Sequence, residues 1–255
     1  MTHVLDLFRL DDKVAVITGA SSGLGAGFAR ALAQAGADVV LAARRADKLE
    51  EVAKQVRELG RRALVVGTDV GDPTQCQTMA DVAITEYGRI DILINNAGVG
   101  TAVPALKESP DEFRRVVDLN LNGAYWAAQA CAQRMGSGSS IVNIASVLGL
   151  IKSYAPQAAY AASKAGLIGL TRDLAQQWSG RRGIRVNAIA PGYFASEMTA
   201  AVPEEELMTF LRQTSPLGRL GRQHELDAAV VFLASPASSY VTGATLAVDG
   251  GMSGH

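Results

Sequence analysis

The chain has 255 residues, 48% of them hydrophobic and 19% charged, which is typical of a globular protein with a full core and excludes an intrinsically disordered chain. Its formal net charge of −1 offers no electrostatic attraction for nucleic acid or for an anionic membrane surface. The 2 cysteines exclude a disulfide framework and favour a reducing, cytoplasmic setting.

Short apolar strands and amphipathic helices alternate along the chain. The first strand, VAVIT at 14–18, precedes a glycine-rich turn and a helix over 24–35. Further strands are expected at 38–42, 63–67, 90–94, 140–145, 184–190 and 244–248, and further helices at 46–59, 72–87, 111–135, 156–179 and 223–234. Continuously apolar strands are buried on both faces, as in parallel sheets between two layers of helices. The sequence therefore predicts an α/β fold, a single-domain, Rossmann-like, doubly wound arrangement with a seven-stranded parallel sheet flanked by helices on both faces.

The stretch from 193 to 220 interrupts this alternation. It contains Pro203, Pro216 and Gly218 together with three consecutive glutamates. A long connection between strand and helix in a compact domain is often functional. We therefore expect one domain over 1–255 with a substrate lid at about 193–220.

The N-terminus and the histidines exclude other classes of site. Acidic and arginine residues interrupt the apolar residues at the N-terminus, so a signal peptide is not expected, and no apolar run reaches the length of a membrane span. His3, His224 and His255 lie far apart and have no cysteine at ligand spacing, so no metal site is expected.

The turn T-G-A-S-S-G-L-G at 18–25 joins the first strand to the first helix. Gly19 permits a tight bend, Gly23 allows a ligand to approach the backbone, and Gly25 allows close packing of helix on strand. The helix N-terminus offers free N–H groups to a pyrophosphate, and two serines add hydroxyl groups. The spacing G-x-x-x-G-x-G differs from the common dinucleotide fingerprint, and a purely structural turn is the alternative. The nucleotide-binding candidates are Gly19, Ser21, Ser22, Gly23, Leu24 and Gly25.

Basic residues follow the second strand, where an acidic residue would favour NAD. Here Ala43 is followed by Arg44 and Arg45, whose guanidinium groups could pair with a 2′-phosphate. We expect Arg44 to bind the cofactor and NADP(H) to be preferred, with NAD(H) as the alternative. The competing interpretation is that both arginines are ordinary surface cations.

Tyr160 and Lys164 are four residues apart in a predicted helix, so they lie on one face. A phenol with a pKa of about 10 is a poor base at neutral pH, and a nearby ammonium lowers that pKa toward general acid–base use. A partly buried tyrosine beside a solvated lysine is the alternative.

Further polar residues are expected near the same edge of the sheet. Asn95–Gly98 (N-N-A-G) follows the fourth strand, and Ser146 follows strand 140–145. Cofactor sites of open α/β sheets collect at the carboxyl ends of the strands. Asn120, a polar residue in a helical segment, could join them.

These motifs, with Pro191–Gly192 and V-D-G-G at 248–251, occur in the order and spacing of the short-chain dehydrogenase/reductase family, which the chain resembles from about residue 10 to 251. The resemblance implies that Tyr160 is the acid–base residue and that Ser146 hydrogen-bonds the substrate oxygen. It implies that Lys164 holds the nicotinamide ribose and lowers the pKa of the phenol, and that Asn120 binds a water that relays protons to Lys164.

The same resemblance implies further cofactor contacts. Asp69 would contact the adenine, Pro191–Gly192 would flank the nicotinamide, and Ser196 would replace a threonine that is common in the family. The additional cofactor-binding residues are Asp69, Val70, Asn96, Ala97, Gly98, Tyr160, Lys164, Pro191, Gly192, Phe194 and Ser196.

The resulting hypothesis is an NADP(H)-dependent oxidoreductase that interconverts a ketone and a secondary alcohol. The alternatives are the same reaction with NAD(H), or a catalytically silent nucleotide-binding sensor on the same fold. The expected partner is a small-molecule substrate, with no nucleic acid and no membrane, and the resemblance implies a homotetramer. The substrate stays open among polyols or sugar acids, 3-oxoacyl thioesters and steroids. Its pocket is expected to be partly apolar and lined by Val147, Leu148, Leu150, Tyr154, Tyr193, Phe194 and Met198.

Overall fold

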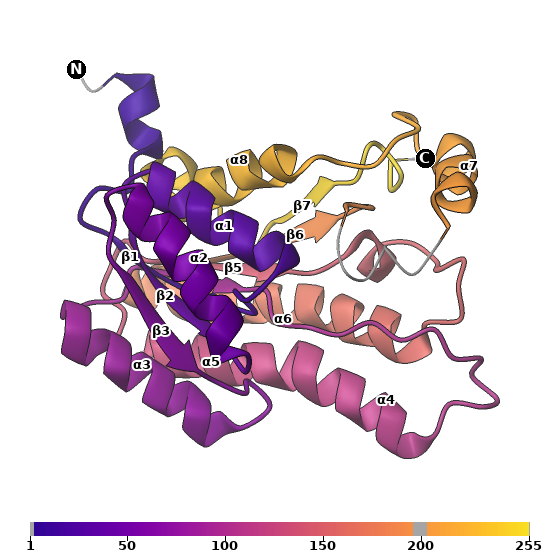
Figure 1. The fold of residues 1–255 in the computed structure, drawn as a ribbon, viewed down its shortest axis with the longest axis horizontal. Coiled ribbons are helices and arrows are strands. Elements are labelled where there is room, and N and C mark those ends of the chain that lie inside the picture. The colour runs from indigo at the N-terminus through magenta and orange to yellow at the C-terminus, as the bar shows by residue number, and fades with distance from the viewer. Residues whose placement is uncertain (1–2, 196–202, 255) are drawn as a thin grey trace.

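A parallel β-sheet forms the centre of the computed structural model, which describes residues 3–195 and 203–254 (Figure 1). Within this described part, seven strands pair in the order β3-β2-β1-β4-β5-β6-β7. The strands are β1 (Val14–Thr18), β2 (Asp38–Ala43), β3 (Ala63–Gly67), β4 (Ile92–Asn95), β5 (Ser140–Ile144), β6 (Arg185–Pro191) and β7 (Thr245–Val248). The predicted fold is therefore confirmed, and the strand order reverses between β1 and β4, where ligands of doubly wound sheets bind.

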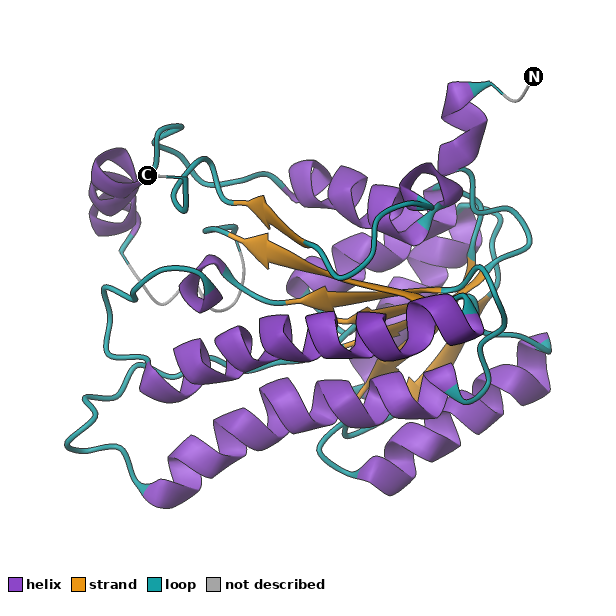
Figure 2. Ribbon diagram, turned by 180° about the vertical axis from the view of Figure 1, so that it is seen from behind, coloured by secondary structure: helices purple, strands orange, loops and turns teal. Residues whose placement is uncertain are grey.

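Helices cover both faces of the sheet because the strands are apolar on both faces (Figure 2). Helices α1 (Gly23–Gln34), α2 (Ala46–Glu58) and α8 (Gln223–Ala234) lie on one face, and their apolar residues share a core with Ile17 of β1. Helices α3 (Pro73–Tyr87), α5 (Gly123–Ala132) and α6 (Ala158–Arg182) lie on the other face, in a core that includes Val16. Successive residues of β1 thus point into different helical layers.

The helical segment predicted as one helix over 111–135 has a different structure. Helix α4 (Pro110–Val117) begins at a capping box formed by Ser109 and Glu112 and leads into a π-helical turn, η2 (Asp118–Asn122), which continues into α5. The segment ends at Ala132. Because a π-turn adds a residue to the helical repeat, it rotates the side chains that follow it, and such turns often mark functional positions. Asn120 lies within this turn.

The interruption at 193–220 contains a helix that the sequence analysis missed. Helix α7 (Glu204–Thr214) begins with three glutamates, which suit the positive end of a helix dipole. It lies beyond the carboxyl ends of β6 and β7 (Figure 1). The remaining expected elements are confirmed, with boundaries that differ by a few residues.

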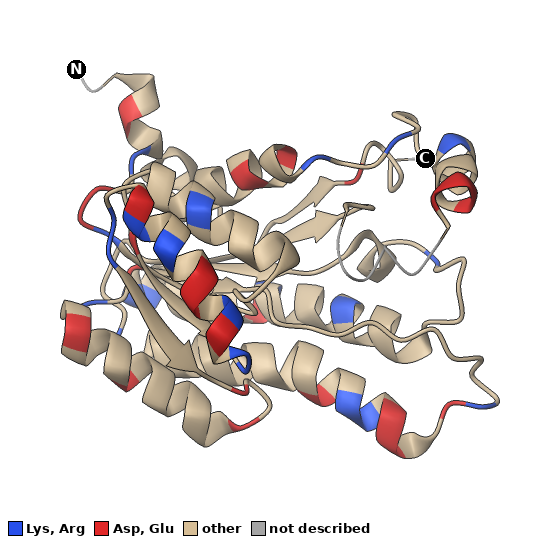
Figure 3. Ribbon diagram, viewed as in Figure 1, with Lys and Arg blue, Asp and Glu red and all other residues tan. Residues whose placement is uncertain are grey.

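Lys and Arg are interspersed with Asp and Glu over the helices drawn in Figure 3 rather than gathered on one face. No helix of the described chain is both long and apolar enough to cross a bilayer. Across residues 3–195 and 203–254, no His, Cys, Asp or Glu side chains gather in a group that could hold a metal ion.

One short helix near the site rests directly on the backbone of α6. The 3-10 helix η3 (Val147–Gly149) follows β5, and a Cβ atom on Gly149 would lie 2.9 Å from the carbonyl carbon and oxygen of Lys164. Only glycine allows this approach, so Gly149 sets the distance between η3 and α6.

We therefore predict that Gly149→Ala lowers the free energy of unfolding by about 1–3 kcal/mol, because the added methyl group must push η3 away from α6. Gly180→Ala is the control, since a Cβ atom at this position of α6 has no neighbour within 4 Å. It should raise stability by about 0.5 kcal/mol through helix propensity. Urea unfolding followed by circular dichroism measures both, and equal stability of the two variants would contradict the prediction.

Candidate active site

The glycine-rich turn leaves the N-terminus of α1 open toward the carboxyl edge of the sheet. Ser22 is the N-cap residue, but its side chain makes no capping hydrogen bond. Gly23 has a φ of +52°, and a Cβ atom there would have nothing within 4 Å. Exposed N–H groups at the start of a 12-residue helix form a site suited to an anion such as a pyrophosphate.

The turn packs tightly on the N-N-A-G segment that follows β4. A Cβ atom on Gly19 would lie 2.8 Å from Ala97 Cα, and one on Gly25 would collide with the Gly19 carbonyl oxygen. The Asn96 amide donates to the carbonyl oxygens of Thr18 at 3.0 Å and Gly19 at 3.2 Å. Two predicted cofactor segments therefore meet at the point where the strand order reverses.

Thr18 is a residue of this region that the sequence analysis did not single out. Its Oγ1 accepts hydrogen bonds from the backbone N–H groups of Asn96 at 3.0 Å and Ala97 at 3.1 Å. A threonine at the end of a buried strand is expected from its β-propensity alone. Only the pairing of β1 with β4 shows that Thr18 holds the start of the N-N-A-G segment in place.

The two arginines after β2 differ in their surroundings. Arg44 is exposed, whereas the Arg45 guanidinium donates to Ser21 Oγ at 3.1 Å and Ser22 Oγ at 2.7 Å. The second arginine thus lies on the glycine-rich turn itself, which places positive charge where β2 ends. The sequence predicts Arg44 as the cofactor contact, and that function stays a prediction.

The residues expected at the adenine end lie between β3 and α3. The Asp69 carboxylate accepts a hydrogen bond from the Gly71 N–H at 3.0 Å. Val70 is buried, and a Cβ atom on Gly123 would lie 2.9 Å from its Cγ2. Asp69 therefore stabilises the turn between β3 and α3, and Val70 packs against the start of α5.

Asn120 connects the loop after β4 to α6. Its side-chain amide donates to Val99 O at 2.9 Å and Ser163 Oγ at 3.1 Å, and its Oδ1 accepts from Val99 N at 2.8 Å. Ser163 in turn donates to Tyr160 O at 2.7 Å. This arrangement gives Asn120 a positioning function through Ser163, a residue missed by the sequence analysis, while water binding by Asn120 stays a prediction.

Lys164 is buried, with a side chain that reaches across to β5. Its Nζ donates to the Ile144 carbonyl oxygen at 2.8 Å. Burial lowers the pKa of Lys164 to about 8, because the charged form loses its hydration. A Cβ atom on Gly98 would lie 3.1 Å from Asn120 Oδ1 and 3.5 Å from Lys164 Nζ, so Gly98 keeps the space between these two groups open.

Tyr160 and Ser146 face each other. Burial raises the pKa of the Tyr160 phenol, and its hydrogen bond with the Ser146 side chain opposes that increase. The Lys164 Nζ lies 5.7 Å from the centroid of the Tyr160 ring. The net shift of the Tyr160 pKa is upward because desolvation exceeds the effect of the Ser146 hydrogen bond, and the Lys164 ammonium hydrogen-bonds to Ile144. That Lys164 lowers the pKa of Tyr160 stays a prediction.

The segment after β6 completes this edge of the sheet. Gly192 N donates to Val248 O at 2.9 Å, which fixes Pro191–Gly192 beside the end of β7. Phe194 is only 6% exposed, and its ring belongs to the core beneath α1 and α8. Its side chain contributes to this packing, and the cofactor contact of Phe194 stays a prediction. Ser196 and Met198 lie outside the described residues.

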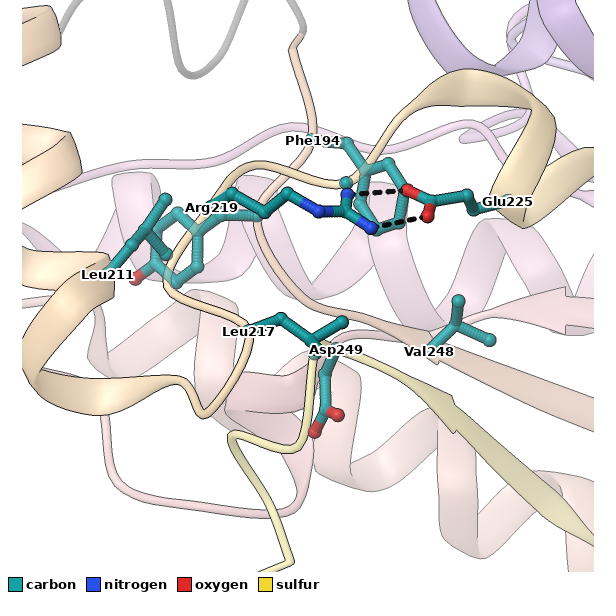
Figure 4. A pocket seen from close by; sticks show the side chains of 10 residues that line it. Phe194, Leu211, Leu217, Arg219, Glu225, Val248 and Asp249 are labelled. Carbon is teal, nitrogen blue, oxygen red and sulfur yellow. Dashed lines mark hydrogen bonds and ion pairs between the residues drawn. The ribbon is translucent and has the colours of Figure 1, made fainter.

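A small cavity of about 90 Å³ lies between β7, α7 and the start of α8 (Figure 4). An ion pair spans one side of it, with Arg219 Nη2 2.7 Å from Glu225 Oε1. The hydrogen bond from Arg219 lowers the pKa of Glu225 to about 2. The lining residues are Tyr193, Phe194, Leu211, Leu217, Arg219, Gly221, Glu225, Val248, Asp249 and Gly250.

Comparison with known proteins agrees with this geometry. A family model described as enoyl-(acyl carrier protein) reductase matches residues 19–253. Galactitol 2-dehydrogenase (L-tagatose-forming) from Cereibacter sphaeroides is 44% identical over 253 residues, which cover 96% of this chain and 96% of that protein. The chain belongs to the short-chain dehydrogenase/reductase family. As a member of this family it is an oxidoreductase of the dehydrogenase/reductase type that acts on alcohols.

Two solved structures show the same fold with cofactors bound. The crystal structure of a gluconate 5-dehydrogenase from Burkholderia cenocepacia in complex with NADP and tartrate is 39% identical, with a TM-score of 0.94, and covers 99% of this chain and 100% of that one. A 7α-hydroxysteroid dehydrogenase complexed with NADH and 7-oxo glycochenodeoxycholic acid is 36% identical, with a TM-score of 0.92, and covers 98% of each chain.

The burial of Lys164 predicts a pH-dependent cost in stability. Its pKa is about 8 in the folded protein against an ordinary value of 10.5, so the folded state binds fewer protons between these values and stability rises with pH there. We expect Lys164→Met to have a larger free energy of unfolding than the wild type below pH 8, because the buried charge is removed. The net gain is about 2 kcal/mol once the lost hydrogen bond to Ile144 is subtracted, and it should shrink toward pH 10.

Urea unfolding at a series of pH values measures this difference. Lys54→Met, an exposed substitution on α2, serves as the control and should show no such trend. A Lys164→Met variant that is less stable than the wild type by the same amount at every pH would contradict the prediction.

Proposed function

We propose that the protein is an NADP(H)-dependent oxidoreductase that interconverts a ketone and a secondary alcohol by hydride transfer, with Tyr160 as the general acid and base. The observation that carries the proposal is the meeting of Ser146, Tyr160 and buried Lys164 beside an open helix N-terminus at the reversal point of a parallel sheet. A structural protein has no evident use for that combination.

The residues of this site divide the work of proton transfer. In reduction, the Tyr160 hydroxyl donates its proton to the carbonyl oxygen; in oxidation, the phenolate accepts the proton of the alcohol. A phenol whose pKa is raised by burial keeps its proton at neutral pH and therefore suits donation to a ketone. Ser146 orients the substrate oxygen, and Asn120 holds α6 in place through Ser163.

The nicotinamide cofactor, when bound, supplies or accepts the hydride. The open turn at Gly23 and the N–H groups of α1 would hold its pyrophosphate. Lys164 would hold the nicotinamide ribose, with Asn96, Ala97, Gly98, Pro191 and Gly192 lining the cleft.

Preference for NADP(H) over NAD(H) is supported by charge at the end of β2. Arg44 is exposed there, Arg45 lies on Ser21 and Ser22, and no acidic residue follows Ala43 directly. The gluconate 5-dehydrogenase relative binds NADP, whereas the steroid dehydrogenase relative binds NADH. Two guanidinium groups near one site favour the 2′-phosphate of NADP(H).

Assembly into a homotetramer is part of the same proposal. In α6, Leu167 and Ile168 are buried, whereas Ala162 and Ala165 on another side of the helix are exposed in the single chain. An exposed face of small residues allows another helix to approach closely, which supports pairing of α6 between subunits.

The alternative is a catalytically silent nucleotide sensor on the same fold. Such a protein needs the glycine-rich turn and the N-N-A-G segment but has no requirement for Ser146 facing Tyr160. The complete set of Asn120, Ser146, Tyr160 and Lys164 therefore favours the enzyme.

The proposal predicts that Tyr160→Phe lowers kcat by about 10²–10⁴-fold, because proton transfer is lost while the ring still packs. NADPH binding, followed by fluorescence titration, should change little. Tyr87→Phe removes a phenolic hydroxyl that lies 3.5 Å from Val39 O, far along the chain from the site, and should retain activity. Activity is followed by the loss of NADPH absorbance with a panel of ketones. Near-wild-type turnover by Tyr160→Phe would refute the function of this residue.

The cofactor preference predicts that Arg44→Ala raises KM for NADPH by about tenfold or more, the effect of losing one charge-assisted hydrogen bond. KM for NADH should change by less than about threefold, because NADH has no 2′-phosphate for the residue to bind. Arg57→Ala removes an exposed arginine from the far end of α2 and should leave both values unchanged. A parallel rise in both KM values for Arg44→Ala would contradict a phosphate-binding function.

A further inference from the structure

Two buried polar side chains join strand β5 to helix α6. The Asn143 amide donates to Thr171 Oγ1 at 2.9 Å, and the Thr171 hydroxyl donates in turn to Leu167 O at 2.8 Å. Asn143 is 1% exposed and Thr171 is fully buried. The sequence analysis considered neither residue, and neither has a part in the proton transfer described above.

Asn143 is itself held by a third buried side chain. Asn95, its partner across the pairing of β4 with β5, donates to Asn143 Oδ1 at 2.9 Å and to Ala124 O at 3.0 Å. Because the amide oxygen of Asn143 accepts from Asn95, its NH₂ group is turned toward Thr171. A strand in the middle of the sheet therefore presents an oriented donor to α6.

Thr171 lies on the face of α6 that carries the reacting residues. Lys164 follows Tyr160 by four residues and Thr171 follows Lys164 by seven, which places all three along one stripe of the helix. The stripe is bonded to β5 at two points, since Lys164 Nζ donates to the carbonyl oxygen of Ile144, the residue after Asn143.

These two bonds differ in stiffness. Lys164 carries its ammonium on a flexible four-carbon stem, so the charged group can keep its bond while the helix slides. Thr171 is short and β-branched, with one restricted side-chain torsion, so its hydroxyl moves with the helix backbone. The bond between Asn143 and Thr171 is therefore the one that fixes the position of the α6 backbone along β5.

The apolar packing at this level does not fix that position equally well. The apolar cluster between α6 and the sheet consists largely of small side chains, with Leu167 and Ile168 against Ala124, Ala145 and Ala188. Apolar burial is non-directional, whereas a hydrogen bond has a preferred distance and angle. A buried polar pair adds little stability over apolar side chains of the same shape, and its specific contribution is one defined arrangement of the core.

We propose that Asn143 is a positioning residue, which acts through Thr171 to fix α6 along β5 and so places Tyr160 opposite Ser146. Ser146 follows β5 and Tyr160 belongs to α6, so the separation of their hydroxyls depends on where the helix lies along the strand. This inference rests on the proposed function and adds residues that act on the reaction only through others.

Thr171→Val tests the proposal, because valine has the shape of threonine but lacks the hydroxyl. We expect kcat to fall by about tenfold or more, since a reacting group displaced by about 1 Å can cost about 100-fold. KM for NADPH should change by less than about threefold, because the glycine-rich turn that would hold the pyrophosphate lies on α1. Thr171→Ser keeps the hydroxyl and should retain kcat within about threefold of the wild type.

The assay follows the loss of NADPH absorbance with three neutral ketones: cyclohexanone, 2-pentanone and ethyl acetoacetate. The variants are compared on the ketone that the wild-type protein reduces fastest. Fluorescence titration with NADPH and thermal unfolding followed by circular dichroism are measured on the same preparations.

A paired variant separates the effect on position from the effect on stability. Thr171→Val leaves the Asn143 amide unpaired in the core and should lower the melting temperature by about 4 °C or more. Asn143→Leu combined with Thr171→Val replaces both partners by apolar side chains of similar shape, and should restore the melting temperature to within about 3 °C of the wild type. Its kcat should stay about tenfold or more below the wild type, because apolar contact does not fix the helix along the strand.

Two controls accompany these variants. Thr78→Val makes the same substitution at an exposed position of α3, where the hydroxyl donates to Thr74 O at 3.0 Å, and should leave kcat unchanged. Ile184→Val removes a methylene group from a fully buried side chain. It should lower the melting temperature by about 2–4 °C and retain kcat.

Several results would overturn the assignment. These are a kcat for Thr171→Val within about threefold of the wild type, an equal loss in Thr171→Ser, and a paired variant whose kcat recovers together with its melting temperature. A loss of kcat in Ile184→Val that matches its loss of melting temperature would also overturn it, since stability alone would then account for the kinetics.

Failure of the proposed function is distinguishable. It appears as a wild-type protein that binds NADPH but oxidises it with none of the ketones, or as an active Tyr160→Phe variant. If Thr171→Val alone does not fold, the paired variant and Thr171→Ser carry the test.

Discussion

The burial of one ammonium group, that of Lys164, is the constraint on which the site depends. A charged group removed from water must find another partner, and here the Ile144 carbonyl oxygen at the end of β5 provides it. Strand β5 and helix α6 are thereby joined at the level of the reacting residues. Gly98 keeps space open next to this ammonium, and Asn120 holds the neighbouring loop, so three separate segments are arranged around a single positive charge.

The fold could be predicted from the sequence because the patterns that indicate strands and helices are local and recur along the chain. Apolar β-branched runs such as 14–18 and 38–43 alternate with amphipathic helices, and burial on both faces distinguishes a parallel sheet from other β-structures. Helix α7 was not predicted because prolines and a glycine flank it and its first turn consists of glutamates, a composition that is also common in loops. The π-turn at Asp118–Asn122 could not be foreseen, since its geometry depends on the bonds that Asn120 makes to Val99 and Ser163, far away in sequence.

The residues of the candidate site could be predicted from the sequence, but the shifts of their pKa values could not. The spacing of Tyr160 and Lys164 placed both on one helix face, and the positions after β4 and β5 placed Asn96 and Ser146 near them. The upward shift of the Tyr160 pKa could not be predicted from spacing, because spacing carries no information about desolvation, which is the largest cause of the shift. Thr18 and Ser163 were missed for a related reason, since a buried hydroxyl acquires its purpose only from partners brought by other elements.

Three aromatic rings connect α7 to the carboxyl edge of the sheet: Phe210 meets Tyr154 edge-on with ring centroids 5.0 Å apart and Tyr193 with ring centroids 5.3 Å apart. Phe210 belongs to α7, which stands apart from the two helical layers that bury the sheet. The hydrogen bonds of Lys164 and Asn120 are made to β5, to α6 and to the loop after β4, whereas α7 meets the segment after β6 through Phe210 and Tyr193. The contacts that hold α7 against the segment after β6 are thus separate from the hydrogen bonds that hold Lys164 and Asn120, so the two regions can vary in sequence independently of one another.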